Sequence, residues 1–216
     1  MSFIVPFPGG GAVRRVFKYA AISNPAAVSV DFASVPLDEF AGNAQICVGV
    51  TARHSSESAQ ISGVSVAGSP ASEIVGAIAA DFYKVKLFSV AHPAVSSGTV
   101  TVTGSGPLLL VGISVYTLYG GAVHDTASSG VQTNPQSVSI DVPALGAAIA
   151  VGVNSSTSNS WSGLSEDTDS NLSGSGTSIN HTSASAEFTT QQSNLSVSRT
   201  MGVTSFPAMV AVSFAP

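Results

Sequence analysis

Apolar and polar residues alternate with a period of two along many short segments of the chain. Residues 99–103 read TVTVT and residues 138–142 read VSIDV, a spacing typical of a β-strand with one face in the core and one in solvent. No segment keeps a period of 3.6 residues with helix-forming residues. The pattern predicts an all-β, antiparallel β-sandwich, with strands at 28–32, 45–51, 62–66, 74–79, 82–90, 98–103, 108–118, 138–142, 147–153, 160–164, 183–189, 195–198 and 209–214.

The chain also repeats itself. Residues 10–32, which contain GGAV and NPAAVSVD, return at 120–142 as GGAV and NPQSVSID, at a constant offset of 110. Later matches have smaller offsets: 103 between Val48 and Val151, 100 between Ile61 and Trp161, and 99 between Val111 and Val210. An offset that only shrinks is expected of a duplication whose second copy lost loop residues. We therefore divide the chain into an extended N-terminal arm (1–9), a first β repeat (10–119) and a second β repeat (120–216).

Two architectures fit this division. The repeats can each supply half of one sandwich with a jelly-roll or lectin-like fold, or they can form two tandem immunoglobulin-like sandwiches. The second repeat is short and rich in loops, and no charged or proline-rich linker separates it from the first. Because a small unit has little apolar surface to bury by itself, the single sandwich is favoured.

Composition limits the kinds of partner. Charged residues make up 9% of the 216 residues and the mean hydropathy is +0.38, so few charges cover the surface and a further interface is expected. The net charge is −5 and the seven basic residues are scattered, which argues against nucleic acid. Residues 1–108 hold six acids and six bases, whereas 109–216 hold six acids and one base, Arg199. One face or end is therefore expected to be acidic.

The single cysteine and the N-terminus bear on location. Cys47 lies in an apolar segment and is predicted to be a buried, unreactive thiol, with no intrachain disulfide. The first residues lack a basic segment ahead of an apolar one, so they do not predict a signal peptide. The longest apolar runs fall short of the roughly 20 residues that span a bilayer. Synthesis in the cytoplasm and no membrane partner are the expectation.

The most suggestive chemical pattern is the acidic stretch at 166–171. Oxygen-bearing side chains at near-alternating positions, as here, are what a calcium loop uses. However, the EF-hand pattern requires glycine where Leu172 stands. We interpret the stretch as a solvated acidic loop and expect no cofactor and no metal, with four weak calcium candidates: Glu166, Asp167, Asp169 and Asn171.

No motif supports catalysis. The four histidines, His54, His92, His124 and His181, lie in or beside predicted loops without metal-ligand spacing, and are expected to be solvated. His124 and Asp125 could be imagined in a triad with a serine, but the chain has no G-x-S-x-G elbow, Walker loop or dinucleotide fingerprint. We expect no enzymatic activity.

Binding candidates are few. Trp161 and Asn159 lie in a stretch rich in serine and asparagine, and such residues can stack on and hydrogen-bond a glycan; the match of Trp161 to Ile61 favours a core position instead. The apolar arm and the two arginines after the first GGAV are candidate interface residues, because the second GGAV is followed by a histidine and an aspartate. They are Phe3, Ile4, Phe7, Arg14 and Arg15.

Three segments carry a resemblance. Residues 148–153, residues 160–167 (SWSGLSED) and residues 182–186 (TSASA) resemble a group of β-sandwich proteins encoded among the structural genes of tailed bacteriophages. Members have lectin-like or jelly-roll folds and serve as head decorations, spikes or fibres. The resemblance implies a non-enzymatic virion protein made in the host cytoplasm, with the major capsid protein or other virion proteins as partners and host glycans as a further contact. We expect a homo-oligomer, with a trimer as the first guess; the alternative is a carbohydrate-binding module outside any particle.

Overall fold

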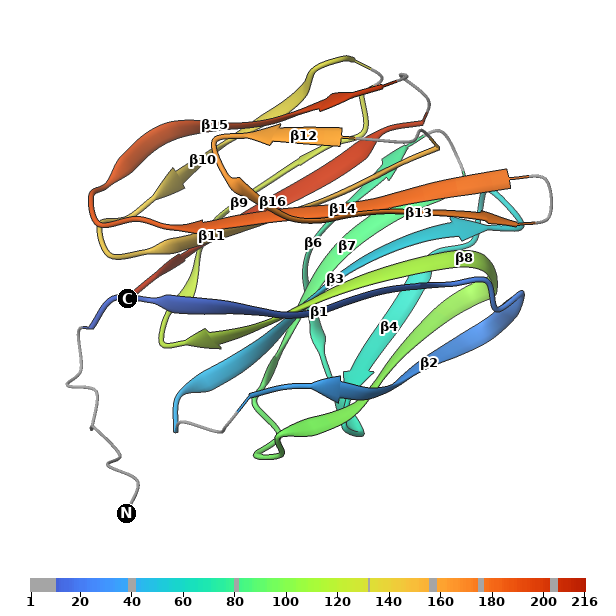
Figure 1. Ribbon diagram of the computed structural model, residues 1–216, viewed down its shortest axis with the longest axis horizontal. Helices are drawn as coiled ribbons and strands as arrows, with labels where there is room; N and C mark the ends of the chain where they lie inside the picture. The colour runs from blue at the N-terminus through green and yellow to red at the C-terminus, as the bar shows by residue number, and fades with distance from the viewer. Residues whose placement is uncertain are drawn as a thin grey trace.

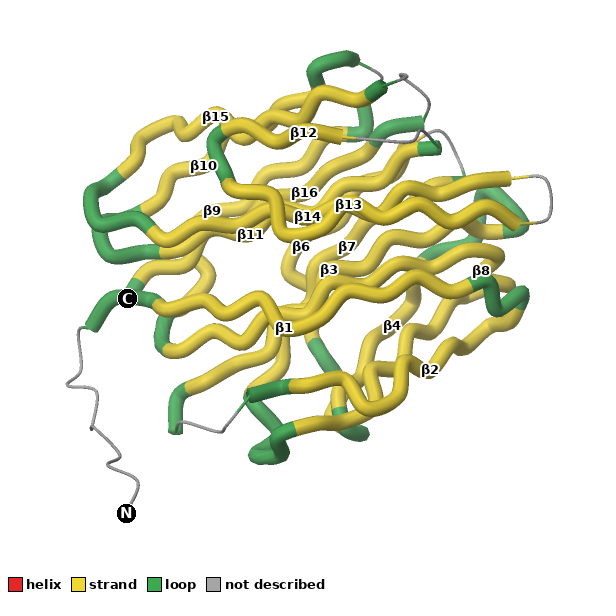
Figure 2. The backbone as a smooth tube through the Cα atoms, viewed as in Figure 1, coloured by secondary structure: helices red, strands yellow, loops and turns green. Residues whose placement is uncertain are grey.

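The computed structural model describes residues 11–38, 42–79, 82–131, 133–155, 159–174, 177–202 and 206–216. These residues form strands and connecting turns (Figure 2). Within them, no helix is long and apolar enough to cross a membrane. The strands are β1 (Arg14–Ser23), β2 (Ala27–Pro36), β3 (Ala44–His54), β4 (Ile61–Val66), β5 (Ser69–Pro70), β6 (Ser72–Ala79), β7 (Tyr83–Ala91), β8 (Ser97–Tyr119), β9 (Ala122–Ser129), β10 (Gln136–Val142), β11 (Ala147–Asn154), β12 (Asn159–Ser162), β13 (Ser165–Gly174), β14 (Thr177–Glu187), β15 (Gln192–Met201) and β16 (Ala208–Ala215).

The first half of the chain folds one sheet back on itself. The first part of the long strand β8 pairs with β2 and β4, and its last part pairs with β1 and β3. Val100 and Val102 from the first part share a core with Val111 and Ile113 from the last part. Glycines and a proline lie between the two parts, at 104, 106 and 107, and such residues allow a strand to bend. One continuous sheet therefore supplies an outer and an inner layer.

The second half builds its two layers from separate sheets. The outer sheet has the order β10-β15-β12, and the inner sheet has the order β13-β14-β11-β16-β9. Ile140 and Val197 from the outer sheet pack against Ala148 and Ala211 from the inner sheet. The whole molecule is a stack of four layers, with the two inner layers face to face (Figure 1). The predicted all-β antiparallel sandwich is confirmed, and its arrangement combines the two that the sequence leaves open: each half has its own two-layer core, and a third core joins them.

Burial follows from this stacking. The inner strand β11 is buried at every residue, and β3 and β16 nearly so, whereas the outer strands β2 and β10 expose alternate residues. A strand covered on both faces needs a near-continuous apolar sequence, and one covered on a single face needs an alternating one. The continuous apolar runs at 147–153 and 208–214 therefore form inner-layer strands, which are covered by another layer on each face.

The two halves share an order of pairing. The inner layer of the first half runs β1-β8-β3-β7-β6, and that of the second runs β9-β16-β11-β14-β13. The predicted match at offset 110 keeps its face, since Val30 and Ile140 each lie in the core of their own half. The matches at 103 and 99 are wrong as structural equivalents. Val48 and Val111 point into the core of the first half, whereas their partners point between the halves, because an odd shift in register reverses the face of every side chain. Duplication itself stays a prediction.

Two polar segments outside the predicted strands form strands in the structure. The segment HDTASSGVQ contributes to β9, which pairs with β16, and the acidic stretch belongs to β13, which pairs with β14. Both strands end the inner sheet of the second half. A strand at a sheet edge pairs on one side only and can expose much of its surface, so it lacks the apolar alternation by which strands are recognised.

The halves meet mainly through side chains, although the Val13 backbone N–H donates to the Leu145 carbonyl at 2.8 Å. Every strand pairing among the described residues stays within one half, while β1 lies against β13, β3 against β11 and β6 against β9. The shared core contains Cys47 and Leu110 from the first half and Val151 and Val210 from the second. At Gly112 a Cβ would lie 2.5 Å from the Cβ of His181, so the inner layers approach closely because this position has no side chain.

We predict that Gly112→Ala destabilises the protein by about 1–3 kcal/mol, because the added methyl forces the two inner layers apart. Chemical denaturation followed by tryptophan fluorescence measures the change. Gly63→Ala is the control: that position is on a strand of the outer layer, with nothing within 4 Å of the new Cβ. Equal effects of the two substitutions would contradict the close approach of the layers.

Candidate functional site

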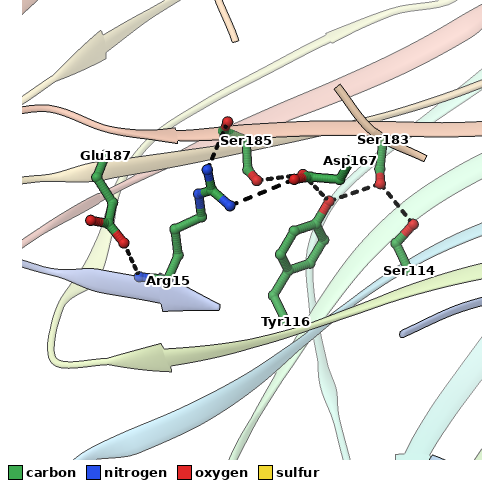
Figure 3. A network of polar contacts seen from close by, with 7 residues as sticks. All are labelled: Arg15, Ser114, Tyr116, Asp167, Ser183, Ser185 and Glu187. Carbon is green, nitrogen blue, oxygen red and sulfur yellow. Dashed lines mark hydrogen bonds and ion pairs between the residues drawn. The ribbon is translucent and has the colours of Figure 1, made fainter. Parts of the chain in front are cut away.

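A buried polar network crosses the boundary between the halves (Figure 3). The Tyr116 hydroxyl on β8 lies 2.9 Å from Oδ2 of Asp167 on β13 and 2.8 Å from Oγ of Ser183 on β14. Ser185 Oγ also donates to Asp167 Oδ2. Arg15 on β1 places Nη1 3.5 Å from Asp167 Oδ1, and its Nη2 donates to the Ser185 carbonyl at 3.2 Å. The carboxylate therefore gathers side chains from both halves.

The network continues inward through Ser114 to His181. Ser114 Oγ lies 2.9 Å from Ser183 Oγ and 2.6 Å from His181 Nε2, and Thr51 Oγ1 lies 2.9 Å from His181 Nδ1. A carboxylate can only accept, so Tyr116 gives its single proton to Asp167 and must accept from Ser183. Ser183 then accepts from Ser114, which accepts from Nε2–H of a neutral His181, whose Nδ1 accepts from Thr51. One consistent direction of donation runs through the whole chain.

Burial sets the charge states in this network. Desolvation lowers the pKa of His181 to about 3, so the imidazole is neutral at physiological pH. Desolvation and the neighbouring Asp167 raise the pKa of Tyr116 well above its usual value, so the phenol keeps its proton. Desolvation also raises the pKa of Asp167, while its hydrogen bonds and Arg15 act in the opposite direction. The Ser114–His181 pair resembles a nucleophile and its base, but both residues are fully buried. With no surface for a substrate to reach, the pair holds the two halves together.

A second polar cluster lies within the second half, between its two layers. Asn154, Asn180 and Asn171 are register partners across β11, β14 and β13, and Asn180 Nδ2 donates to Asn171 Oδ1 at 3.0 Å. In the next row, Asp169 accepts from Asn180 Nδ2 at 2.6 Å and from the backbone N–H of Asn159 at 2.9 Å. Asn159 Nδ2 also donates to Asp169 Oδ1, at 3.2 Å, and to Asn180 Oδ1. Amide groups thus fix this carboxylate firmly in place.

An arginine and a tryptophan from the outer sheet lie beside this cluster. Arg199 is fully buried, and its Nε and Nη2 donate to Gln136 Oε1 at 3.1 and 2.8 Å. Desolvation lowers its pKa to about 9, partly offset by Asp169. The Trp161 indole N–H donates to Thr182 Oγ1 at 2.7 Å. Arg199 Nη1 and Asn154 Oδ1 are buried without a hydrogen-bond partner among the described residues.

The interpretation of the acidic stretch as a loop is wrong, and its four weak calcium candidates do not all face the same side. Its four candidates lie on strand β13, which has a register shift between Glu166 and Thr168. As a result Asp167 points between the halves, while Asp169 points toward the outer sheet and Asn159. Two carboxylates on opposite faces of one sheet cannot share an ion. Among the described residues, no three His, Cys, Asp or Glu side chains are grouped as metal ligands.

Four of the other candidate site residues lie within the described part of the chain. Trp161 is half-buried against the second-half core, and Asn159 belongs to the Asp169 cluster. Arg15 binds Asp167 within the same chain, and the guanidinium of Arg14 lies 5.5 Å from the ring centre of Tyr119. Phe3, Ile4 and Phe7 lie outside the described residues.

The expectation of solvated histidines is wrong for three of the four. His54 and His181 are fully buried and His92 nearly so, whereas His124 is exposed. His92 places Nε2 2.8 Å from the Leu37 carbonyl. Cys47 is fully buried and desolvation raises its pKa, as predicted for an unreactive thiol. No sequence pattern indicates the Ser114–His181 pair, because its members are 67 residues apart. The asparagines at 154, 159, 171 and 180 are a sequence signal for the second polar cluster.

We predict that the protein loses stability in mild acid. The folded-state pKa values of His181 and His54 are about 3 and about 4, against 6.5 for an unperturbed histidine. Between these values the unfolded chain binds protons that the folded protein does not, so the free energy of unfolding falls as pH drops from 6.5, by up to about 1.4 kcal/mol per unit for each histidine. The raised pKa of Asp167 opposes this near pH 4. Urea denaturation at several pH values gives the free energy of unfolding as a function of pH. The slope of this dependence should be shallower for His181→Gln than for wild type and unchanged for the exposed His124→Gln. Equal slopes in wild type and His181→Gln would refute the assignment of a buried, neutral His181.

We also predict that Tyr116→Phe costs about 1–3 kcal/mol of stability, since it leaves Asp167 and Ser183 buried with fewer partners. Thermal or chemical denaturation at neutral pH measures the loss. Tyr19→Phe, at a half-buried position on β1, is the matched control and should change stability by less than about 0.5 kcal/mol. A neutral effect of Tyr116→Phe would show that the network contributes nothing to joining the halves.

Comparison with known proteins identifies no relative of this chain. A scan against protein-family models and a search of curated protein sequences both find no match to this chain. The functional assignment therefore depends on the positions and chemistry of the residues described above.

Proposed function

We propose that the protein is a non-enzymatic virion subunit, a head decoration or an external spike or fibre component of the kind found in tailed bacteriophages. It would act as a homo-oligomer mounted on other virion proteins such as the major capsid protein. Two features support a structural role over a catalytic one. The Ser114–His181 pair is sealed between the layers, and the buried carboxylate Asp167 is committed to Tyr116, Ser185 and Arg15.

The observation that carries the proposal is a group of exposed apolar side chains, here called the end patch: Ile78, Val131 and Phe206. Their exposed fractions are 50%, 62% and 42%. Gly130 packs directly on the Ile78 carbonyl, and Gln136 Nε2 donates to the carbonyls of Val131 and Pro207 at 3.2 and 3.3 Å. Both halves therefore contribute to the patch.

The aromatic member of the end patch is held in place. Phe206 stacks on Tyr83, with ring centres 5.4 Å apart and an angle of 8° between the rings. A ring fixed in this way loses little freedom when a partner covers it. Clustered exposed apolar residues mark protein contact surfaces, so the end patch is the surface that we assign to a neighbouring subunit.

The test combines oligomeric state with attachment to particles. Mass photometry of the full chain should show an oligomer, and purified heads or tails should bind it. Phe206→Ser together with Val131→Ser should shift the protein to monomer while far-UV circular dichroism shows that the chain remains folded. Val28→Ser is the control, since Val28 is also 50% exposed but lies on the outer strand β2.

A wild-type protein that is monomeric and fails to bind heads or tails would defeat the proposal. An oligomer that survives the double substitution would move the subunit contact away from the end patch. The two readouts therefore test the assembly role and its location separately.

A further inference from the structure

The outer sheet of the second half leaves one inner strand partly uncovered. Three outer strands lie over five inner ones, and β12 is the outer strand in contact with β13. On the side of β13 that faces the outer sheet, Glu166 and Asn171 are exposed and Asp169 is half-buried. Trp161 and Asn159 on β12 stand next to them. We call these five residues the β13 shelf.

Register places the tryptophan beside the carboxylate. Trp161 donates to Thr182, and the register partner of Thr182 on β13 is Asp169. Asn159, two residues before Trp161, bonds Asp169 directly, through both its backbone and its side chain. The shelf thus sets a half-exposed aromatic side chain next to a carboxylate that is held by amides.

The hydrogen bonds within the cluster determine what the shelf can still bind. Asp169 Oδ1 accepts from two amide groups. Among the described residues, Oδ2 accepts only the Asn159 backbone N–H, which leaves it capacity for a further donor. Asn171 uses its Oδ1 as an acceptor, so its Nδ2 group is a donor on an exposed side chain. An acceptor and a donor side by side match a hydroxyl group, which donates and accepts at once.

Two buried atoms beside the same cluster lack a hydrogen-bond partner among the described residues. Asn154 is fully buried and donates from Nδ2 to Asn159 Oδ1 at 3.0 Å, yet its own Oδ1 has no partner among the described residues. Arg199 Nη1, in the same space between the sheets, is a donor without an acceptor. Because Asn154 and Arg199 are fully buried, an enclosed water can satisfy both atoms, whereas a ligand on the shelf cannot reach them. A cation could satisfy only the acceptor, and the charge of Arg199 would repel it.

We infer that the β13 shelf binds a neutral sugar. In this assignment Asp169 and Asn171 bind adjacent ring hydroxyls, and Trp161 supplies apolar contact to the ring, as aromatic side chains do in sugar sites. Asp169 and Asn171 are the central residues of this site, whereas the sequence suggests Trp161 and Asn159. It does not depend on the particle role proposed above, because a monomer in solution would retain the shelf.

The test uses the full-length protein and saturation-transfer difference NMR with the methyl glycosides of galactose, mannose, glucose and N-acetylglucosamine, together with a printed array of bacterial surface oligosaccharides. At least one sugar should bind, and Asn171→Ala and Asp169→Asn should each weaken binding tenfold or more. Asp31→Asn is the matched control, since Asp31 is an exposed carboxylate that accepts from Thr101 on the outer layer of the first half; it should bind as wild type does.

The outcomes separate this inference from the particle role. No binding by folded wild-type protein, or binding unchanged in the exposed-site variant Asn171→Ala, overturns the shelf whatever the oligomeric state. Binding that disappears with EDTA and returns with calcium overturns direct recognition in favour of a cation. Sugar binding by a monomer that attaches to no particle supports the shelf and defeats the proposed virion role.

Discussion

Close packing of the two inner layers is the constraint on which the rest of the structure depends. Because β3, the last part of β8, β11 and β16 are covered on both faces, their sequences must be apolar or small nearly throughout. A connected set of polar groups enters this space, from Thr51 through His181 to Asp167. A buried polar group without a partner is costly, so the network must have both halves in place at once. It is apolar packing that brings the halves together, and the network that fixes how they are aligned.

The same stacking explains how a chain with few charges covers its surface. In the outer sheet of the second half, outward-facing hydroxyls line up across the strands: Ser137 lies opposite Ser198, which lies opposite Ser162, and Ser160 lies opposite Thr200. These groups hydrogen-bond water without carrying charge. Part of the apolar surface that suggested a further interface is buried between the two halves of the same chain. The end patch is the apolar surface that remains for a partner.

The two halves differ in the spaces between their layers. The first half encloses mainly large aliphatic side chains such as Ile61 and Leu108. The second encloses alanines together with Arg199, Asn154 and Asn180. Two carboxylates on strand β13, Asp167 and Asp169, differ in their access to solvent. Asp167 is enclosed between the halves and joins them, whereas Asp169 reaches an uncovered edge and remains able to accept a hydrogen bond from a ligand.

The sequence by itself determined the all-β class and the strands with alternating or continuous apolar residues. It also determined that equivalent residues of β2 and β10, such as Val30 and Ile140, face a core. These results follow from the pattern of apolar residues, because that pattern reflects which side chains are buried. It could not show β9 and β13, since edge strands with polar faces lack that periodicity. Nor could it tell that three histidines are buried, that Asp167 and Asp169 face opposite ways, or that Ser114 meets His181. Those facts depend on register, where a shift of one residue reverses a face, and on which layers pack together, which only the tertiary structure decides.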